Sequence, residues 1–115
     1  MAEDCLFCKI IAGQIPSNKV YSDADVYAFR DINPAAPQHI LLIPRKHISN
    51  IAAANAADEA LLGKLLLKAN GIATEAGLHE SGFRYVINTG ADGGQTVFHL
   101  HLHILGGRRM HWPPG

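Results

Sequence analysis

Three of the seven histidines in this 115-residue chain fall within five positions, in the run His99-Leu100-His101-Leu102-His103. The alternation with leucine is typical of a β-strand, in which successive side chains point to opposite faces. The three imidazoles are therefore expected on one face, with neighbouring Cα atoms about 6–7 Å apart. Imidazoles this close repel one another when protonated, so some of them must be neutral near pH 7. A neutral ring nitrogen can act as a metal ligand or as a nucleophile.

The segment before this run is suited to bind a phosphate. Gly93 and Gly94 offer backbone amides with little steric cover, and Gln95 and Thr96 add a side-chain amide and a hydroxyl. A nest of N–H donors binds an anion without net positive charge, and a phosphate beside a neutral imidazole implies a phosphoryl-histidine that water later resolves. The alternatives are a structural glycine turn, a solvated strand face and a three-histidine catalytic zinc site, although three ligands on one strand converge on one ion less readily than two.

Cys5 and Cys8 form a second pattern, a C-x-x-C pair in a short predicted helix. The pair by itself could be redox-active, two packed thiols, or half of a zinc site that histidine nitrogens complete. Two cysteines cannot build a disulfide framework, which favours a reducing compartment and a cytoplasmic location.

The hydrophobic pattern predicts the elements that position these residues. Residues 61–76 carry leucine, isoleucine and alanine at three- and four-residue spacing, which predicts one long helix with Asn55 as its N-cap and Gly77 at its end. A short helix over residues 4–12 would be capped by Asp4. Five short strands are expected, at residues 20–21, 26–30, 40–43, 83–88 and 97–105. This arrangement predicts an α+β domain with a mainly antiparallel sheet.

Length and composition narrow the class of protein further. A chain of 12.4 kDa with 48% apolar residues predicts one folded domain over residues 1–115. Ten basic and ten acidic side chains cancel, so no net field attracts nucleic acid or an anionic membrane. No apolar stretch approaches the roughly 18 residues of a membrane span. We therefore expect neither nucleic acid nor a membrane as a partner.

The run from His99 to Leu105 resembles the motif of the histidine-triad (HIT) family, in which three histidines alternate with apolar residues. Similar motifs extend over nearly the whole chain, at residues 28–32, 43–48, 93–95 and 105–108. The tail at residues 110–115, Met-His-Trp-Pro-Pro-Gly, is similar to that of the histidine-triad nucleotide-binding (Hint) branch. The resemblance implies a HIT-like fold that forms a homodimer with a continuous sheet, in which each tail approaches the partner's site.

The resemblance also implies an activity. The Hint branch hydrolyses or transfers nucleoside monophosphate groups, typically from purine nucleoside phosphoramidates and aminoacyl-adenylates. His101 would be the nucleophile that forms a nucleotidyl-histidine, and His103 would contact the phosphate and assist the leaving group. An imidazole with an ordinary pKa near 6.5 is suited to protonate a leaving amine. The positions that match the nucleotide contacts of the branch are Asp31, Ile32, Asn88, Gly94, Gln95, Thr96, His101, His103 and Trp112.

A structural zinc ion is a further implication of the resemblance. Some bacterial members bind zinc through a C-x-x-C pair, the histidine of an Ile-Pro-x-x-His motif and the first triad histidine, which here are Cys5, Cys8, His47 and His99. Four protein ligands leave no position for a substrate, so no cofactor is expected in catalysis. Two other functions stay open, a nucleotide- or zinc-binding regulatory module and a dinucleoside polyphosphate hydrolase, and the tail argues against the latter. The sequence assigns no task to His39.

Overall fold

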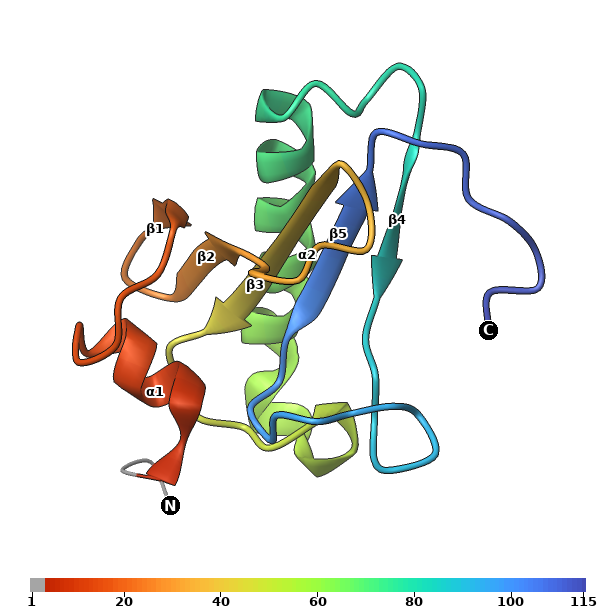
Figure 1. Ribbon diagram of the computed structural model, residues 1–115. Coiled ribbons are helices and arrows are strands. Elements are labelled where there is room, and N and C mark those ends of the chain that lie inside the picture. The colour runs from red at the N-terminus through yellow and green to blue at the C-terminus, as the bar shows by residue number, and fades with distance from the viewer. Residues whose placement is uncertain (1–3) are drawn as a thin grey trace.

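The computed structural model describes residues 4–115, in which a five-stranded antiparallel sheet is flanked by helices (Figure 1). The strands are β1 (Lys19–Ser22), β2 (Val26–Arg30), β3 (Gln38–Pro44), β4 (Phe83–Val86) and β5 (Leu102–Gly106). Their order across the sheet is β1-β2-β3-β5-β4, so β3 and β5 pair at its centre. The predicted α+β class is confirmed. The predicted domain boundaries include residues 1–3, which lie outside the described residues.

Helices cover the two faces of the sheet. The long helix α2 (Glu59–Glu75) packs on one face, and its buried residues Leu65, Ala69 and Ile72 join the larger part of the core. The short helix α1 (Leu6–Ile11) packs on the other, where Phe7 and Ile10 contact the smaller part. β3 contributes to both, which explains its continuously apolar sequence. No helix within residues 4–115 combines the length and hydropathy that spanning a bilayer requires.

The starts of the helices differ from the sequence prediction. Helix α1 begins after Cys5 rather than after Asp4, and the Cys5 Sγ accepts the amide hydrogen of Cys8 at 3.3 Å. A thiol is a weak acceptor, so cap preferences favoured the aspartate. Asn55 caps the 3-10 turn η3 (Ala56–Asp58) that leads into α2, instead of capping α2 itself. A second 3-10 turn, η2 (Ile51–Ala53), precedes it.

The last two strands are shorter than predicted. β5 begins at Leu102 instead of residue 97, so His99 and His101 lie in the segment that leads into the strand. The neighbouring strand β3 ends at Pro44, and proline has no N–H with which to continue a ladder. β4 likewise ends at Val86 instead of residue 88. The sheet therefore stops where the candidate chemistry begins.

The predicted division of faces holds in this segment even without strand pairing. The apolar residues of the run all lie in the core under α2, namely Leu100, Leu102 and Ile104. The amide of Leu100 donates to the carbonyl oxygen of Ile48 at 2.6 Å, which replaces a ladder hydrogen bond. The rings of His99 and His101 lie on the other face, where both contact the ring of Phe7.

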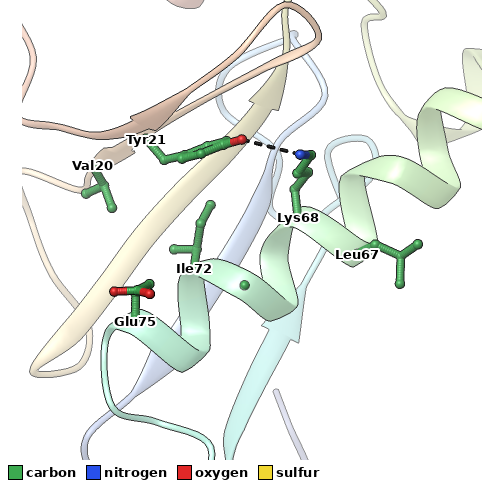
Figure 2. Close-up of a pocket in the computed structure, with 7 residues that line it drawn as sticks. Val20, Tyr21, Leu67, Lys68, Ile72 and Glu75 are labelled. Atoms are coloured by element: carbon green, nitrogen blue, oxygen red, sulfur yellow. Dashed lines mark hydrogen bonds between the residues drawn. The ribbon is translucent and has the colours of Figure 1, made fainter.

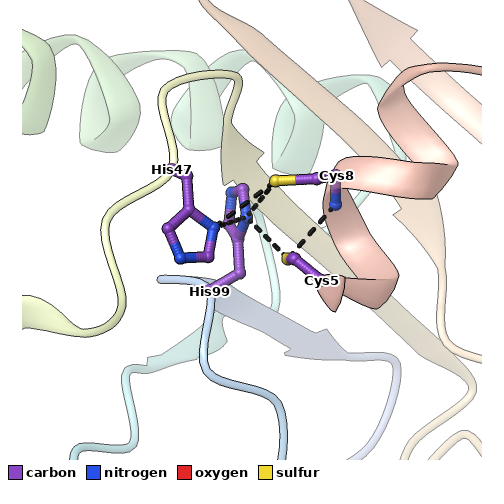
Figure 3. A group of neighbouring side chains, drawn as sticks. All are labelled: Cys5, Cys8, His47 and His99. Atoms are coloured by element: carbon purple, nitrogen blue, oxygen red, sulfur yellow. Dashed lines mark hydrogen bonds between the residues drawn. The ribbon is translucent and has the colours of Figure 1, made fainter. Parts of the chain in front are cut away.

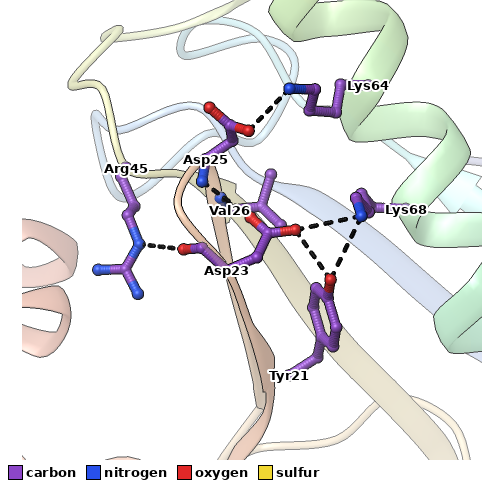
Figure 4. Close-up of polar contacts among 7 residues, drawn as sticks. All are labelled: Tyr21, Asp23, Asp25, Val26, Arg45, Lys64 and Lys68. Atoms are coloured by element: carbon purple, nitrogen blue, oxygen red, sulfur yellow. Dashed lines mark hydrogen bonds and ion pairs between the residues drawn. The ribbon is translucent and has the colours of Figure 1, made fainter.

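Asp23 stabilises the turn between β1 and β2 (Figure 4). Its Oδ1 accepts the amide hydrogens of Asp25 and Val26 at 2.8 and 2.9 Å. Its Oδ2 accepts the Tyr21 hydroxyl at 2.8 Å and lies 3.3 Å from Nζ of Lys68 on α2. Burial by itself would raise the pKa of Asp23, but these donors outweigh it and hold the pKa well below its usual range.

We predict that Asp23→Ala lowers the free energy of unfolding by about 1–3 kcal/mol, because two backbone amides and a hydroxyl lose their acceptor. Urea unfolding of this variant should be compared with that of Asp92→Ala, which removes a carboxylate from an exposed loop. Equal unfolding midpoints for the two variants would show that the Asp23 contacts contribute nothing to stability.

Candidate active site and metal centre

His101 is held in one tautomer by the backbone. Its Nδ1 lies 2.7 Å from the carbonyl oxygen of His99. A carbonyl oxygen can only accept, so Nδ1 carries the proton and Nε2 keeps a free lone pair. The ring is 7% exposed, and Phe7 packs against it edge to face with ring centroids 5.1 Å apart. His101 therefore has the fixed ring orientation that a nucleophilic imidazole requires, with Nδ1 on the backbone carbonyl and Nε2 left for the substrate.

A chain of hydrogen bonds fixes the tautomer of His103 in the same way. The amide of Ala35 donates to Nδ1 of His39 at 3.0 Å, so neutral His39 carries its proton on Nε2. That Nε2 lies 2.9 Å from Nδ1 of His103, which must then accept. The proton of neutral His103 is consequently on Nε2, a buried atom that has no hydrogen-bond partner within residues 4–115. An unpaired buried donor costs about 1–3 kcal/mol, and a ligand oxygen or nitrogen would satisfy it.

The rings of His39 and His103 are both neutral at pH 7. Burial lowers the pKa of His103 to about 4, and the nearby His101 and His39 act in the same direction. Burial also lowers the pKa of His39, although the Asp31 carboxylate, 3.4 Å from its Nε2, opposes the shift. The ordinary pKa near 6.5 that the sequence predicts for the proton donor is therefore wrong for His103. The structure instead presents a neutral Nε2–H on His103, aimed by His39.

Two of the predicted nucleoside contacts lie beside the hydrogen-bonded pair His39 and His103. The Asp31 Oδ1 accepts the amide hydrogen of Asn33 at 2.8 Å, which holds the carboxylate close to His39. The next residue, Ile32, is 90% exposed. An apolar side chain left open to water beside an anchored carboxylate is a suitable surface for a base and a ribose.

In the glycine-rich loop, the backbone at Gly93 lies close to the backbone at Thr89. Gly94 has a φ of 83°, a conformation that favours glycine, and a Cβ on Gly93 would collide with the carbonyl of Thr89. The amides of Gly94 and Gln95 donate to carbonyl oxygens within the loop, each at 3.0 Å. Donors to a phosphate must therefore come from positions next to these two amides, and Thr96 is exposed there.

The side chain of Gln95 is also committed to the loop. Its Oε1 accepts the amide hydrogen of Gly90 at 2.9 Å, and its Nε2 donates to the carbonyl oxygen of Ser49 at 2.8 Å. The residue is 6% exposed. Gln95 thus ties the loop to the segment after β3, and the structure supports a positioning role for its side chain.

The remaining two predicted contacts are Asn88, which follows the strand paired with His103, and Trp112 on the C-terminal tail. Asn88 is half-buried, two residues beyond β4. The tail runs along the outer side of β4, where Nη2 of Arg84 donates to the carbonyl oxygen of His111 at 2.8 Å (Figure 1). Trp112 on this tail is 82% exposed. Within the described chain, the structure does not bring Trp112 to the histidines.

The predicted metal ligands converge from three segments (Figure 3). The Nδ1 atom of His99 lies 3.3 Å from Sγ of Cys5, 3.5 Å from Sγ of Cys8 and 3.2 Å from Nδ1 of His47. Tetrahedral zinc, with Zn–S near 2.3 Å and Zn–N near 2.0–2.1 Å, separates its ligand atoms by roughly 3.3–3.8 Å. The Nε2–H of His99 donates to the Pro44 carbonyl at 2.8 Å, which leaves Nδ1 free for a metal. The four residues fit a zinc ion.

Comparison with known proteins agrees with this geometry. A sequence model of the HIT domain matches residues 12–110. The chain belongs to the HIT domain family. An uncharacterized HIT-like protein of Synechocystis is 57% identical over 115 residues, and the match covers all of both chains. A 14 kDa zinc-binding protein of Zea mays is 51% identical over 112 residues, which are 96% of this chain and 87% of that protein. The crystal structure of a HIT family hydrolase from Legionella pneumophila is 52% identical, covers 96% of this chain and 99% of its own, and superposes with a TM-score of 0.95.

An apolar groove of this HIT domain lies away from the histidines. It holds about 430 Å³ between β1 and α2, on the face of the sheet that α2 covers (Figure 2). Its one cation, the Lys68 ammonium, is already engaged by the Tyr21 hydroxyl at 3.3 Å. The groove presents no nucleophile or proton donor comparable to the histidine cluster, so we place the candidate chemistry at the histidines.

Sequence reasoning missed His39. No local pattern shows that it faces His103, since the two lie 64 positions apart. Their contact follows from the antiparallel pairing of β3 with β5, in which Leu41 is opposite His103. The only available signal was the place of His39, a histidine outside the triad, at the start of an apolar strand.

We predict that burial of neutral His103 makes the HIT domain less stable in mild acid. The unfolded chain takes up a proton near pH 6.5, whereas the folded chain does so only near pH 4, so stability falls as pH drops between these values. In His103→Gln, the pH dependence of the unfolding free energy should be shallower, by less than the roughly 1.4 kcal/mol per pH unit of one full proton. Urea unfolding at several pH values measures this, with His79→Gln as the control. An unchanged slope in His103→Gln would mean that His103 has the same pKa in the folded and unfolded chains, and that burial does not lower it.

Proposed function

We propose that this protein is a purine nucleoside phosphoramidate hydrolase of the Hint branch, which releases AMP or GMP through a nucleotidyl-histidine at His101. The observation that carries the proposal is the tautomer of His101, because its Nδ1–H on the His99 carbonyl leaves Nε2 free to attack phosphorus. The Legionella relative is named a hydrolase, which supports hydrolysis as the general reaction.

The two triad rings have different tasks in this mechanism. Nε2 of His101 bonds to phosphorus as the P–N bond breaks, and Nε2–H of His103 donates to the phosphate and the departing nitrogen. The departing amine takes its proton from solvent water, because neutral His103 donates a hydrogen bond from Nε2 but cannot give up that proton without becoming an imidazolate. Water then attacks the nucleotidyl-histidine and releases a proton, so the site returns to its starting state. Both steps need His103 neutral, as its lowered pKa allows.

The remaining contacts would select the nucleotide. The Asp31 carboxylate and the exposed Ile32 are placed to receive ribose and base next to His103. Asn88 and Thr96 would contact the phosphate. Gly94, whose amide is already donated to the Ala91 carbonyl, would let the loop backbone approach it, and the side-chain amide of Gln95 holds the loop. A zinc ion held by four protein ligands would have no position for substrate, so we expect the metal to take no part in either chemical step.

We predict that His101→Asn lowers turnover of an adenosine phosphoramidate by at least about 10³-fold, because the nucleophile is removed while its neighbours stay. Rapid acid quench and intact-mass measurement should detect a nucleotidyl adduct on the wild type and none on the variant. His79→Gln serves as the control histidine substitution.

Two outcomes of this assay would replace the proposal. Equal rates for the wild type and His101→Asn would exclude His101 as the nucleophile. A wild type that binds AMP but turns over no phosphoramidate would favour the regulatory binding module. Preference for a dinucleoside polyphosphate would favour the third function.

We also propose that Cys5, Cys8, His47 and His99 hold a structural zinc ion. The donor distances and the name of the maize relative support this assignment. When bound, the ion would link α1, the segment after β3 and the lead-in to β5. Both cysteines are free thiols, which suits a reducing compartment such as the cytoplasm. Metal analysis of the purified protein should find one zinc per chain, and less than about half would count against the site.

We further propose a homodimer in which each tail completes the partner's site. The free edge of β4 and the exposed Trp112 support this arrangement. Trp112→Ala should change the ranking of phosphoramidates with different amines by about 5-fold or more, because a large apolar contact to the leaving group is lost. Sedimentation of the wild type should show a dimer. An unchanged ranking would show that Trp112 does not touch the substrate.

A further inference from the structure

His99 belongs both to the active site and to the four predicted zinc ligands Cys5, Cys8, His47 and His99, which we call the metal cluster. Its ring contributes Nδ1 to the group formed with Cys5, Cys8 and His47. Its carbonyl oxygen accepts the Nδ1–H of His101, the bond that sets the tautomer of the proposed nucleophile. His99 therefore takes part in both sets of contacts, and any movement of its backbone changes the position of the His101 ring.

The contacts that hold His99 are unequal in strength. Without a metal, its ring is fixed by packing against Phe7 and by one hydrogen bond, from Nε2–H to the Pro44 carbonyl. The opposite edge of the ring faces only thiols and a second imidazole, and thiols are weak hydrogen-bond partners. Metal–ligand bonds would replace these weak contacts with strong ones.

The metal cluster is also open to exchange with solvent. A pocket of about 460 Å³ borders it. The residues that line this pocket include two of the ligands, Cys5 and His47, together with Asp4, Ser49 and Thr96. Cys8 and His47 are half-buried rather than fully enclosed. A chelator or a competing metal-binding protein could therefore reach the ion without unfolding the domain.

We propose that the metal cluster is an exchangeable device that positions the nucleophile, so that zinc occupancy controls the rate of the chemical step. Loading fixes the His99 carbonyl, which fixes His101 with its Nε2 towards the substrate. Loss of the metal removes the strong contacts on the ring side of His99, so that its peptide group is held mainly by the hydrogen bond from the Leu100 amide to the Ile48 carbonyl. Rotation about this bond misaligns His101, while the nucleoside contacts at Asp31 and Ile32 stay intact. This inference rests on the proposed hydrolase function and adds its regulation.

The proposal predicts a separation of kcat from nucleotide binding. Misplacement of a reacting group by about 1 Å can cost roughly 10²-fold in rate. We therefore expect the metal-free protein to have a kcat lower by ~10- to 100-fold, with an affinity for AMP that changes less than about 3-fold. A site that only stabilised the fold would lower the amount of active protein without this separation.

The experiment compares the metal-free and zinc-loaded wild type with two variants, His47→Gln and His79→Gln. His47→Gln removes the ligand on the pocket side and leaves His99 and His101 in place. His79→Gln changes a histidine outside the metal cluster. Circular dichroism checks the fold, calorimetry measures AMP binding, and ¹⁵N NMR at fixed pH reports which ring nitrogen of His101 carries the proton. A chromogenic chelator measures the rate of zinc release.

The expected result has four parts. The Nδ1–H signal of His101 is single and sharp in the loaded protein and weakened or multiple in the metal-free protein. The kcat follows zinc occupancy, and excess zinc restores much of the kcat of His47→Gln. His79→Gln behaves as the wild type. The chelator removes zinc while the domain stays folded.

Two results would overturn the proposal. One is an identical kcat and His101 signal with and without zinc in a folded protein, and the other is zinc release only upon unfolding. The hydrolase can fail separately. A loaded protein with an ordered His101 signal but no turnover would support the positioning of His101 by the metal and overturn the phosphoramidate reaction.

Discussion

The hydrogen bond from His101 to the carbonyl oxygen of His99 is the contact on which the site depends. It exists because the chain at this point is not paired in the sheet, as β3 ends at Pro44 and β5 begins only at Leu102. A regular ladder would direct that carbonyl towards a neighbouring strand. Here the carbonyl is free to accept the imidazole hydrogen two residues later. The end of the sheet therefore creates the acceptor that fixes the candidate nucleophile.

In the rest of the site, burial and hydrogen bonds set the charge and the ring orientation of the histidines. Burial lowers the pKa values of His39, His99 and His103, so the cluster avoids the repulsion that protonated rings would impose. The imidazoles also need defined orientations, and three of them receive one from a backbone group: Ala35 for His39, Pro44 for His99 and His99 for His101. The Nε2–H of His103 is the exception, because it has no partner among residues 4–115. The fold tolerates its cost at the position where a substrate would satisfy it.

The sequence predicted those features that depend on local periodicity. Alternation along 99–104 assigned the histidines and the apolar residues to opposite faces, and the fold class and long helix followed from spacing. It failed where a distant segment decides the outcome. The start of β5 depends on where β3 ends, and the role of His39 depends on strand register. The Cys5 cap shows a different limit, because the Cys5 thiol accepts the amide hydrogen that starts the helix and so displaces the expected Asp4.

The exposed apolar residues show where the described chain is incomplete as a binding surface. The interior is well paired, yet Ile32 and Trp112 are 90% and 82% exposed. Single exposed apolar residues are common, but Ile32 adjoins the anchored Asp31 and Trp112 lies on a tail beyond a free sheet edge. A nucleoside would cover the first and a second protomer could bring the other to the same substrate. The rigid histidines would then perform the chemistry, while these open apolar surfaces would determine which nucleotide and which amine are accepted.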